Sequence, residues 1–99
     1  MPPEVWLRFQ ELRERNIPSE AAPVIAADPR AKASTIDTIV ETYLYVRSHD
    51  IPWHPAAIIA SSQGTFRYVN NGYSRVIATY RRLMEEGDEP AEAAINSIF

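Results

Sequence analysis

The large apolar residues between positions 65 and 84 recur at intervals of three and four, the spacing that places side chains on one face of an α-helix. They are Phe66, Val69, Tyr73, Val76, Ile77, Tyr80, Leu83 and Met84. An alternating, strand-like pattern would instead put Arg75 and Thr79 on the apolar face. The spacing therefore predicts a long amphipathic helix over residues 65–86, which needs neighbours to cover its apolar side.

The dipeptide Asn71-Gly72 supports a competing structure, because Asn-Gly is the strongest short signal for a two-residue β-hairpin. Residues 65–69 are rich in β-branched and aromatic types and could pair with residues 73–77. We favour the helix, since its period collects every large apolar residue on one side. Gly72 then lies inside the helix or at a break in it, at a cost of about 1 kcal/mol relative to alanine.

Prolines mark the ends of the other predicted helices, because proline has no amide hydrogen and restricts the residue before it. The predicted segments are residues 3–16, a short turn at 23–27, 34–48, 55–60 and a last helix from residue 90. Gly87 is expected to cap the long helix, and His49 with Asp50 to cap the segment 34–48. No internal repeat is apparent. The sequence therefore predicts an all-α, compact domain of five or six helices over residues 1–99.

Each of these helices has an apolar face that we expect to be buried. The expected core positions are Val5, Trp6, Phe9 and Leu12 in the first helix, Ile36, Ile39, Val40, Tyr43 and Leu44 in the segment 34–48, and Ala91, Ala94, Ile95 and Ile98 in the last. Trp53 is expected to fold back as a core anchor.

Composition excludes several classes of protein. The 99 residues include no cysteine, so a disulfide framework and a cysteine-based zinc site are both excluded. No apolar run approaches the roughly 18 to 20 residues that a membrane-spanning helix needs, and the first residues lack a signal-peptide pattern. We therefore expect a cytoplasmic protein with no membrane partner.

Charge is distributed unevenly along the chain. There are 13 acidic and 10 basic residues and a net charge of −3, whereas domains that coat nucleic acid usually carry a strong basic excess. Residues 52–84, however, contain arginines and His54 but no Asp or Glu. This pattern predicts a basic face on an acidic body.

The middle of the chain resembles the helix-turn-helix and winged-helix class of DNA-binding domains. A helix precedes a short helix containing Ile59 and Ala60, Gly64 follows Ala60 by four positions, and a longer helix comes next. A small residue followed four positions later by glycine is similar to the turn pattern of that class. The chain departs from the class at Gln63 and Asn70, where apolar residues are usual, and in having a helical segment after Gly87 instead of a wing.

The resemblance implies a small regulator of transcription, of the kind found in phages or mobile elements, that binds double-stranded DNA. The second helix of the unit would enter the major groove while the preceding helix contacts the backbone. Arg67 and Arg75 would bond guanine edges and Asn71 an adenine edge, each pair contributing about 1 to 3 kcal/mol of discrimination. The implied contact residues are Gln63, Thr65, Arg67, Tyr68, Asn71, Ser74, Arg75 and Arg82. So few phosphate contacts give a shallow salt dependence, and a homodimer or a partner would supply the missing affinity.

The same residues also suit a protein of a different class, a helical adaptor or inhibitor that binds another protein and no nucleic acid. Its contact patch would include Arg67, Tyr68, Arg75 and the C-terminal pair Ile98 and Phe99. An exposed tyrosine beside arginine is typical of protein interfaces as well as of nucleic-acid sites. The acidic total and the missing wing favour this alternative.

Catalytic and metal-binding patterns are weak. His49-Asp50, with His54 nearby, is a dipeptide that metal-dependent phosphohydrolases also use, but a binuclear site needs further histidines and carboxylates. There is no cysteine nucleophile, and the three glycines are too far apart to form a phosphate-binding loop. We therefore expect no enzymatic activity, no metal and no cofactor.

Overall fold

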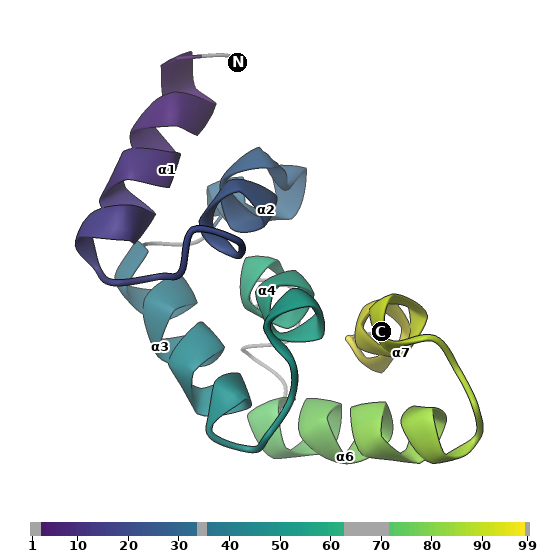
Figure 1. Cartoon of the computed structure of the whole chain (residues 1–99). Coiled ribbons are helices and arrows are strands. Elements are labelled where there is room, and N and C mark those ends of the chain that lie inside the picture. Colours follow the sequence, from purple (N-terminus) through teal and green to yellow (C-terminus); the bar gives the residue numbers. More distant parts are fainter. Residues whose placement is uncertain (1–2, 34–35, 63–71, 99) are drawn as a thin grey trace.

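Helices are the regular elements of this chain wherever the computed structural model describes it, which is over residues 3–33, 36–62 and 72–98 (Figure 1). They are α1 (Pro3–Glu14), α2 (Ala22–Ala27), the 3-10 helix η1 (Pro29–Ala33), α3 (Ile36–Arg47), α4 (Trp53–Ser61), α6 (Gly72–Glu85) and α7 (Pro90–Ser97). These residues contain no strand. The predicted all-α class is confirmed.

The helix boundaries follow the prolines and glycines closely, with two differences. α4 begins at Trp53, so Pro55 is the third residue of that helix and not its first. α6 begins at Gly72, so residues 73–77 are helical and cannot be the second strand of the hairpin that Asn71-Gly72 suggested. Residues 65–71 of the predicted long helix, and the predicted start at residue 34, lie outside the described residues.

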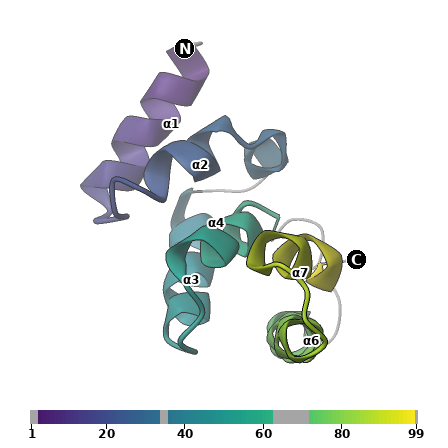
Figure 2. The same ribbon diagram turned by 45° about the vertical axis from the view of Figure 1, so that its right-hand side comes forward.

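The helices pair into three helical hairpins, α1 with α2, α3 with α4, and α6 with α7. Figure 1 shows α1, α3 and α6 along the outside of an arc, with α2, α4 and α7 on its inner side. Within the inner layer α4 packs against both α2 and α7, and in the outer layer α1 meets α3. Figure 2 gives the same order from another side, so the hairpins form a stack with α4 at its centre.

The turns of the first two hairpins repeat one another. Residues 13–18 read RERNIP and residues 47–52 read RSHDIP. In each, the arginine donates from Nη1 to the carbonyl oxygen of the isoleucine four residues later, at 2.7 Å from Arg13 to Ile17 and at 2.8 Å from Arg47 to Ile51. Both isoleucines are buried. The structure thus contains a repeated unit, which corrects the expectation of no internal repeat.

A residue in the left-handed region of backbone space ends each outer helix. These residues are Asn16 with φ 67°, Asp50 with φ 64° and Gly87 with φ 97°. After α6, the Gly87 amide donates to the Met84 carbonyl and the Asp88 amide to the Leu83 carbonyl, both at 3.1 Å. That pair of bonds is the Schellman arrangement, so the predicted capping role of Gly87 is confirmed.

The core is centred on α4, because three other helices surround it. Residues 55–62 are all buried, including the hydroxyl-bearing Ser61 and Ser62, whose side chains donate to the carbonyls of Ala57 and Ile58. The expected core positions Leu12, Ile39, Val40, Tyr43, Val76, Ile77, Tyr80, Ala94 and Ile98 are also buried.

Three expected core residues are exposed instead. Trp6 is 49% exposed, Leu44 56% and Ile95 40%. Each lies on the apolar stripe of its helix but faces a direction from which no described helix covers it. Trp53 is only partly buried, and its ring meets the ring of His54 edge-on at 5.2 Å.

Candidate interaction surface

The outward face of α6 carries those predicted contact residues that the structure describes. Ser74, Arg75 and Arg82 are all exposed, as the helical period predicted. The other predicted contacts, Gln63, Thr65, Arg67, Tyr68 and Asn71, lie in residues 63–71, outside the described part of the chain. The structure therefore describes only the part of the predicted basic face that lies on α6.

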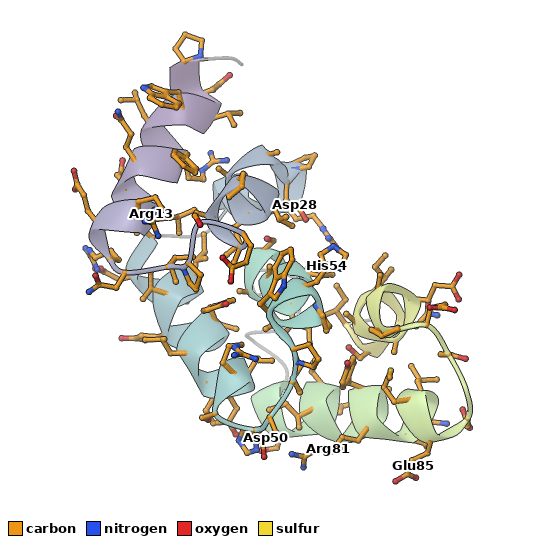
Figure 3. The ribbon with its side chains drawn as sticks, in the orientation of Figure 1. Arg13, Asp28, Asp50, His54, Arg81 and Glu85 are labelled. Carbon is orange, nitrogen blue, oxygen red and sulfur yellow. The ribbon has the colours of Figure 1, made fainter. Side chains whose placement is uncertain are left out.

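Two arginines on this face are already engaged by the protein itself. Arg81 donates from Nη2 to the His49 carbonyl oxygen at 3.0 Å, which ties α6 to the end of α3. Figure 3 shows Arg81 beside Asp50 at this corner. Arg82 lies 3.5 Å from the Glu86 carboxylate, one helical turn away, so part of its charge is neutralised. Among the described residues Arg75 has no such ion pair.

α4 has little surface left for a DNA backbone. In a helix-turn-helix unit the helix before the recognition helix crosses the backbone. Here α4 packs against α2, α3 and α7, while α6 packs chiefly against α7. Only the first turn of α4, at His54, is exposed.

The two histidines occupy separate places. The His49 ring meets the Tyr45 ring edge-on at 4.8 Å beside α6, whereas Figure 3 shows His54 on the inner side, where α4 faces α2. No group of three His, Asp or Glu residues that could hold a metal occurs in residues 3–33, 36–62 and 72–98.

Asp28 and Arg30 form an ion pair where α2 ends and η1 begins. Oδ1 of Asp28 accepts from the Arg30 backbone amide at 2.9 Å and from its Nε at 3.0 Å, while Oδ2 accepts from Nη2 at 2.7 Å. Partial burial acts to raise the pKa of Asp28, but the three bonds and the charge of Arg30 outweigh it and hold that pKa below its ordinary value of 3.8. The pair stabilises the turn that seats η1 on α4.

This pair predicts an acid-sensitive contribution to stability. Because the pKa of Asp28 is lower in the folded than in the unfolded chain, its contribution is fully present above the ordinary value and lost as pH falls through the lowered one. We expect Asp28→Asn to flatten the fall in the free energy of unfolding below about pH 4. Urea titrations of both proteins at several pH values measure the difference, and parallel curves would contradict the prediction.

Sequence reasoning missed three exposed large apolar side chains on the outer layer. Leu7 on α1 is 58% exposed, and Leu44 and Tyr45 on α3 are exposed as well. We call Leu7, Leu44 and Tyr45 the outer apolar face. The sequence signal for these exposed side chains was that large apolar residues stand next to one another in the chain. Neighbouring residues point about 100° apart on a helix, so both members of such a pair rarely lie in one buried stripe.

None of the described helices is both long and apolar enough to cross a membrane. Comparison with protein-family models, with curated proteins and with solved structures returns no significant match.

Proposed function

We propose that this chain is a helical protein–protein interaction module that binds its partner through the outer apolar face. One observation carries the proposal. Besides Trp6 on α1 and Ile95 on α7, the large apolar side chains exposed in the described residues are the three of this face, Leu7 on α1 and Leu44 and Tyr45 on α3. Single exposed apolar residues are ordinary, but several on successive helices are typical of a surface that another protein covers.

The chemistry of this face suits a protein partner. Leu7 and Leu44 offer aliphatic surface, and full burial of each is worth about 1.5 to 3 kcal/mol. Tyr45 adds an aromatic ring, a residue type enriched at protein interfaces. The helices that carry them are fixed by the turns at Ile17 and Ile51, so the face is largely formed before binding and little ordering entropy is lost.

The test is a capture experiment from nuclease-treated extract of the cells that express the protein. Wild-type chain should retain a protein partner in stoichiometric amount, and the double variant Leu7→Glu with Leu44→Glu should lose it. Both positions are more than half exposed, so the variant should fold. Arg75→Ala is the matched control on α6 and should retain the partner. Equal capture by the wild type and the double variant would contradict the proposal.

DNA binding through α6 and the preceding residues is the second candidate. Ser74 and Arg75 favour it, because both are exposed and Arg75 makes no ion pair within the described part of the chain. Alanine at Arg67, Asn71 and Arg75 together should abolish a duplex gel shift at moderate salt, where association by charge alone fades. Unchanged binding by the triple variant would exclude base contacts by these residues.

A further inference from the structure

The three helical hairpins are copies of one unit. Residues 3–27 match residues 37–61 and residues 74–98 position by position, without a gap. The match brings together the left-handed residues that end the outer helices, which are Asn16, Asp50 and Gly87. The third hairpin therefore repeats the unit whose turn the first two hairpins share.

Residue types and burial support this match. Thr-Tyr recurs in the outer helices of the second and third copies, at residues 42–43 and 79–80. Ala-Ala recurs in their inner helices, at residues 56–57 and 93–94. Both tyrosines and both alanine pairs are buried. The copies therefore use the same positions for packing, which leaves the same positions facing outward.

Six positions of the unit are exposed in all three copies, so packing within the stack needs no apolar side chain at any of them. They are Pro3, Leu7, Gln10, Glu11, Glu14 and Asn16 in the first copy, Asp37, Glu41, Leu44, Tyr45, Ser48 and Asp50 in the second, and Ser74, Ala78, Arg81, Arg82, Glu85 and Gly87 in the third. We call them the shared exposed positions. The large apolar residues among them are Leu7, Leu44 and Tyr45, which are the outer apolar face.

Trp6 and Ile95 are exposed for a different reason. Their equivalents in the second copy, Val40 and Ile58, are buried, so exposure at these two positions depends on the place of the copy in the stack. Exposure of the outer apolar face does not, because its positions face outward in every copy.

Charge at the shared exposed positions is one-sided in the first two copies. These copies hold Glu11, Glu14, Asp37, Glu41 and Asp50 there and no basic residue, whereas the third holds Arg81, Arg82 and Glu85. Asp37 pairs with Arg15, and Figure 3 shows Asp50 beside Arg81. Glu11, Glu14 and Glu41 make no ion pair in the described part of the chain. A cation from outside can therefore reach these three carboxylates.

The arginines of the first two hairpins lie at other positions and are engaged by the chain itself. Arg8, Arg13 and Arg47 donate to the carbonyl oxygens of Ala26, Ile17 and Ile51, at 3.0, 2.7 and 2.8 Å. Arg15 and Arg30 pair with Asp37 and Asp28. The outward carboxylates are thus left to a partner.

The second copy gathers one carboxylate and two apolar side chains on a single helix. Leu44 and Tyr45 follow Glu41 by three and four residues, a spacing at which side chains are neighbours on a helix surface. Leu44 is 56% exposed and Tyr45 39%, and Glu41 is exposed too. This set suits an apolar side chain beside a Lys or Arg, because the carboxylate pairs with the cation and the face of a tyrosine ring attracts it.

We propose that the outward face of α3 binds a basic, apolar segment of the partner protein. Leu44 and Tyr45 receive its apolar side chain, and Glu41 receives its cation. Glu11 and Glu14 on α1, which meets α3, add negative charge of the same sign. Opposite charge speeds the encounter and sets its orientation, whereas nucleic acid would be repelled. The inference rests on the proposed function and adds the chemistry of the partner.

A random peptide library displayed on phage and selected on the immobilised whole chain tests this assignment. The same library is selected in parallel on Leu44→Glu. That variant adds a carboxylate, so a peptide held by charge alone binds it at least as well as the wild type. We expect the peptides enriched only on the wild type to carry Lys or Arg within about four positions of a large apolar residue.

Fluorescence anisotropy with a labelled synthetic copy of the most enriched peptide gives its dissociation constant. Glu41→Lys should raise that constant about 3- to 10-fold at low salt and less at high salt, as for an exposed charge pair. Glu85→Lys is the matched control, since it makes the same change at a shared exposed position of the third copy, and it should have little effect. Circular dichroism should give equal helix content for all variants.

Contrary outcomes have definite meanings. Equal enrichment on the wild type and Leu44→Glu, or no enrichment on either, would overturn the assignment. So would enriched peptides without basic residues, or equal effects of Glu41→Lys and Glu85→Lys, even if the apolar contact remains. The proposed function fails separately, when Leu7→Glu with Leu44→Glu captures the same protein from extract as the wild type.

Discussion

Replacing Ile59 with alanine is expected to lower the free energy of unfolding by roughly 2 to 5 kcal/mol. Ile59 is 1% exposed and lies in α4, which α2, α3 and α7 surround. Helices packed on three sides cannot easily collapse into the space left by the lost methyl groups, so a cavity term adds to the lost transfer energy. Since small domains are typically stable by only about 5 to 15 kcal/mol, this single change removes a large share of the total.

Urea unfolding followed by far-ultraviolet circular dichroism measures the effect. Ile95→Ala is the matched control, because the same atoms are removed from a side chain that is 40% exposed in α7. We expect this control to cost less than about 1 kcal/mol. Similar losses at the two positions would mean that α4 is not the centre of the core.

Gly87→Ala is expected to cost about 1 to 2 kcal/mol, the penalty for placing a Cβ atom in the left-handed region. The φ of Gly87 is 97°, and an added Cβ would meet no other atom within 4 Å. The loss therefore comes from the local backbone conformation, without a clash against another part of the fold. The helix content of α6 should otherwise be preserved, because the change lies after its last turn.

Asp50→Gly provides the opposite test at the end of α3. Asp50 holds a φ of 64° without being glycine and places a negative charge at a helix C-terminus, where the dipole disfavours it. Glycine removes both penalties, so we expect a gain of about 0.5 to 1 kcal/mol. Thermal or urea unfolding of the two variants should give shifts of opposite sign, and shifts of the same sign would contradict the assigned helix ends.

Local chemistry made the helix boundaries predictable. Pro18, Pro52 and Gly87 impose their backbone preferences wherever they occur, so turns near them follow from sequence alone. The buried stripe of α6 was equally predictable, because its period is unbroken from Val76 to Met84. The exposure of Arg75 on the opposite side of α6 followed from the same period.

Burial that depends on neighbouring helices was not predictable. Trp6 and Val40 occupy equivalent stripe positions when the two turns are matched, yet Trp6 is exposed and Val40 is buried. The second hairpin packs against the first through α2 and α4, whereas no earlier described helix packs against the first. In the adaptor alternative Ile98 was expected to contact a partner, but its side chain is buried. A contact by its neighbour Phe99 stays a prediction, because Phe99 lies outside the described residues. The bond from Arg81 to the His49 carbonyl joins two helices that no local pattern connects.

The repeat also escaped sequence reasoning for a physical reason. The two turns share only their arginine, isoleucine and proline, since Asn16 and Asp50 reach the left-handed region with different side chains. The helices that flank the turns need only be amphipathic, and many residue choices meet that need. The two turns therefore have the same geometry although few of their residues are identical.

In each of the first two turns, the arginine side chain donates a hydrogen bond to a carbonyl only four residues later, from Arg13 to Ile17 and from Arg47 to Ile51. Each hairpin can therefore assemble from nearby parts of the chain, and docking then proceeds from one hairpin to the next. In such a stack each hairpin is stabilised mainly by its immediate neighbours. The interior hairpin therefore unfolds last, and a terminal hairpin with fewer neighbours unfolds first. By that logic the amide hydrogens of α4 should exchange most slowly, and those of α1 should exchange faster.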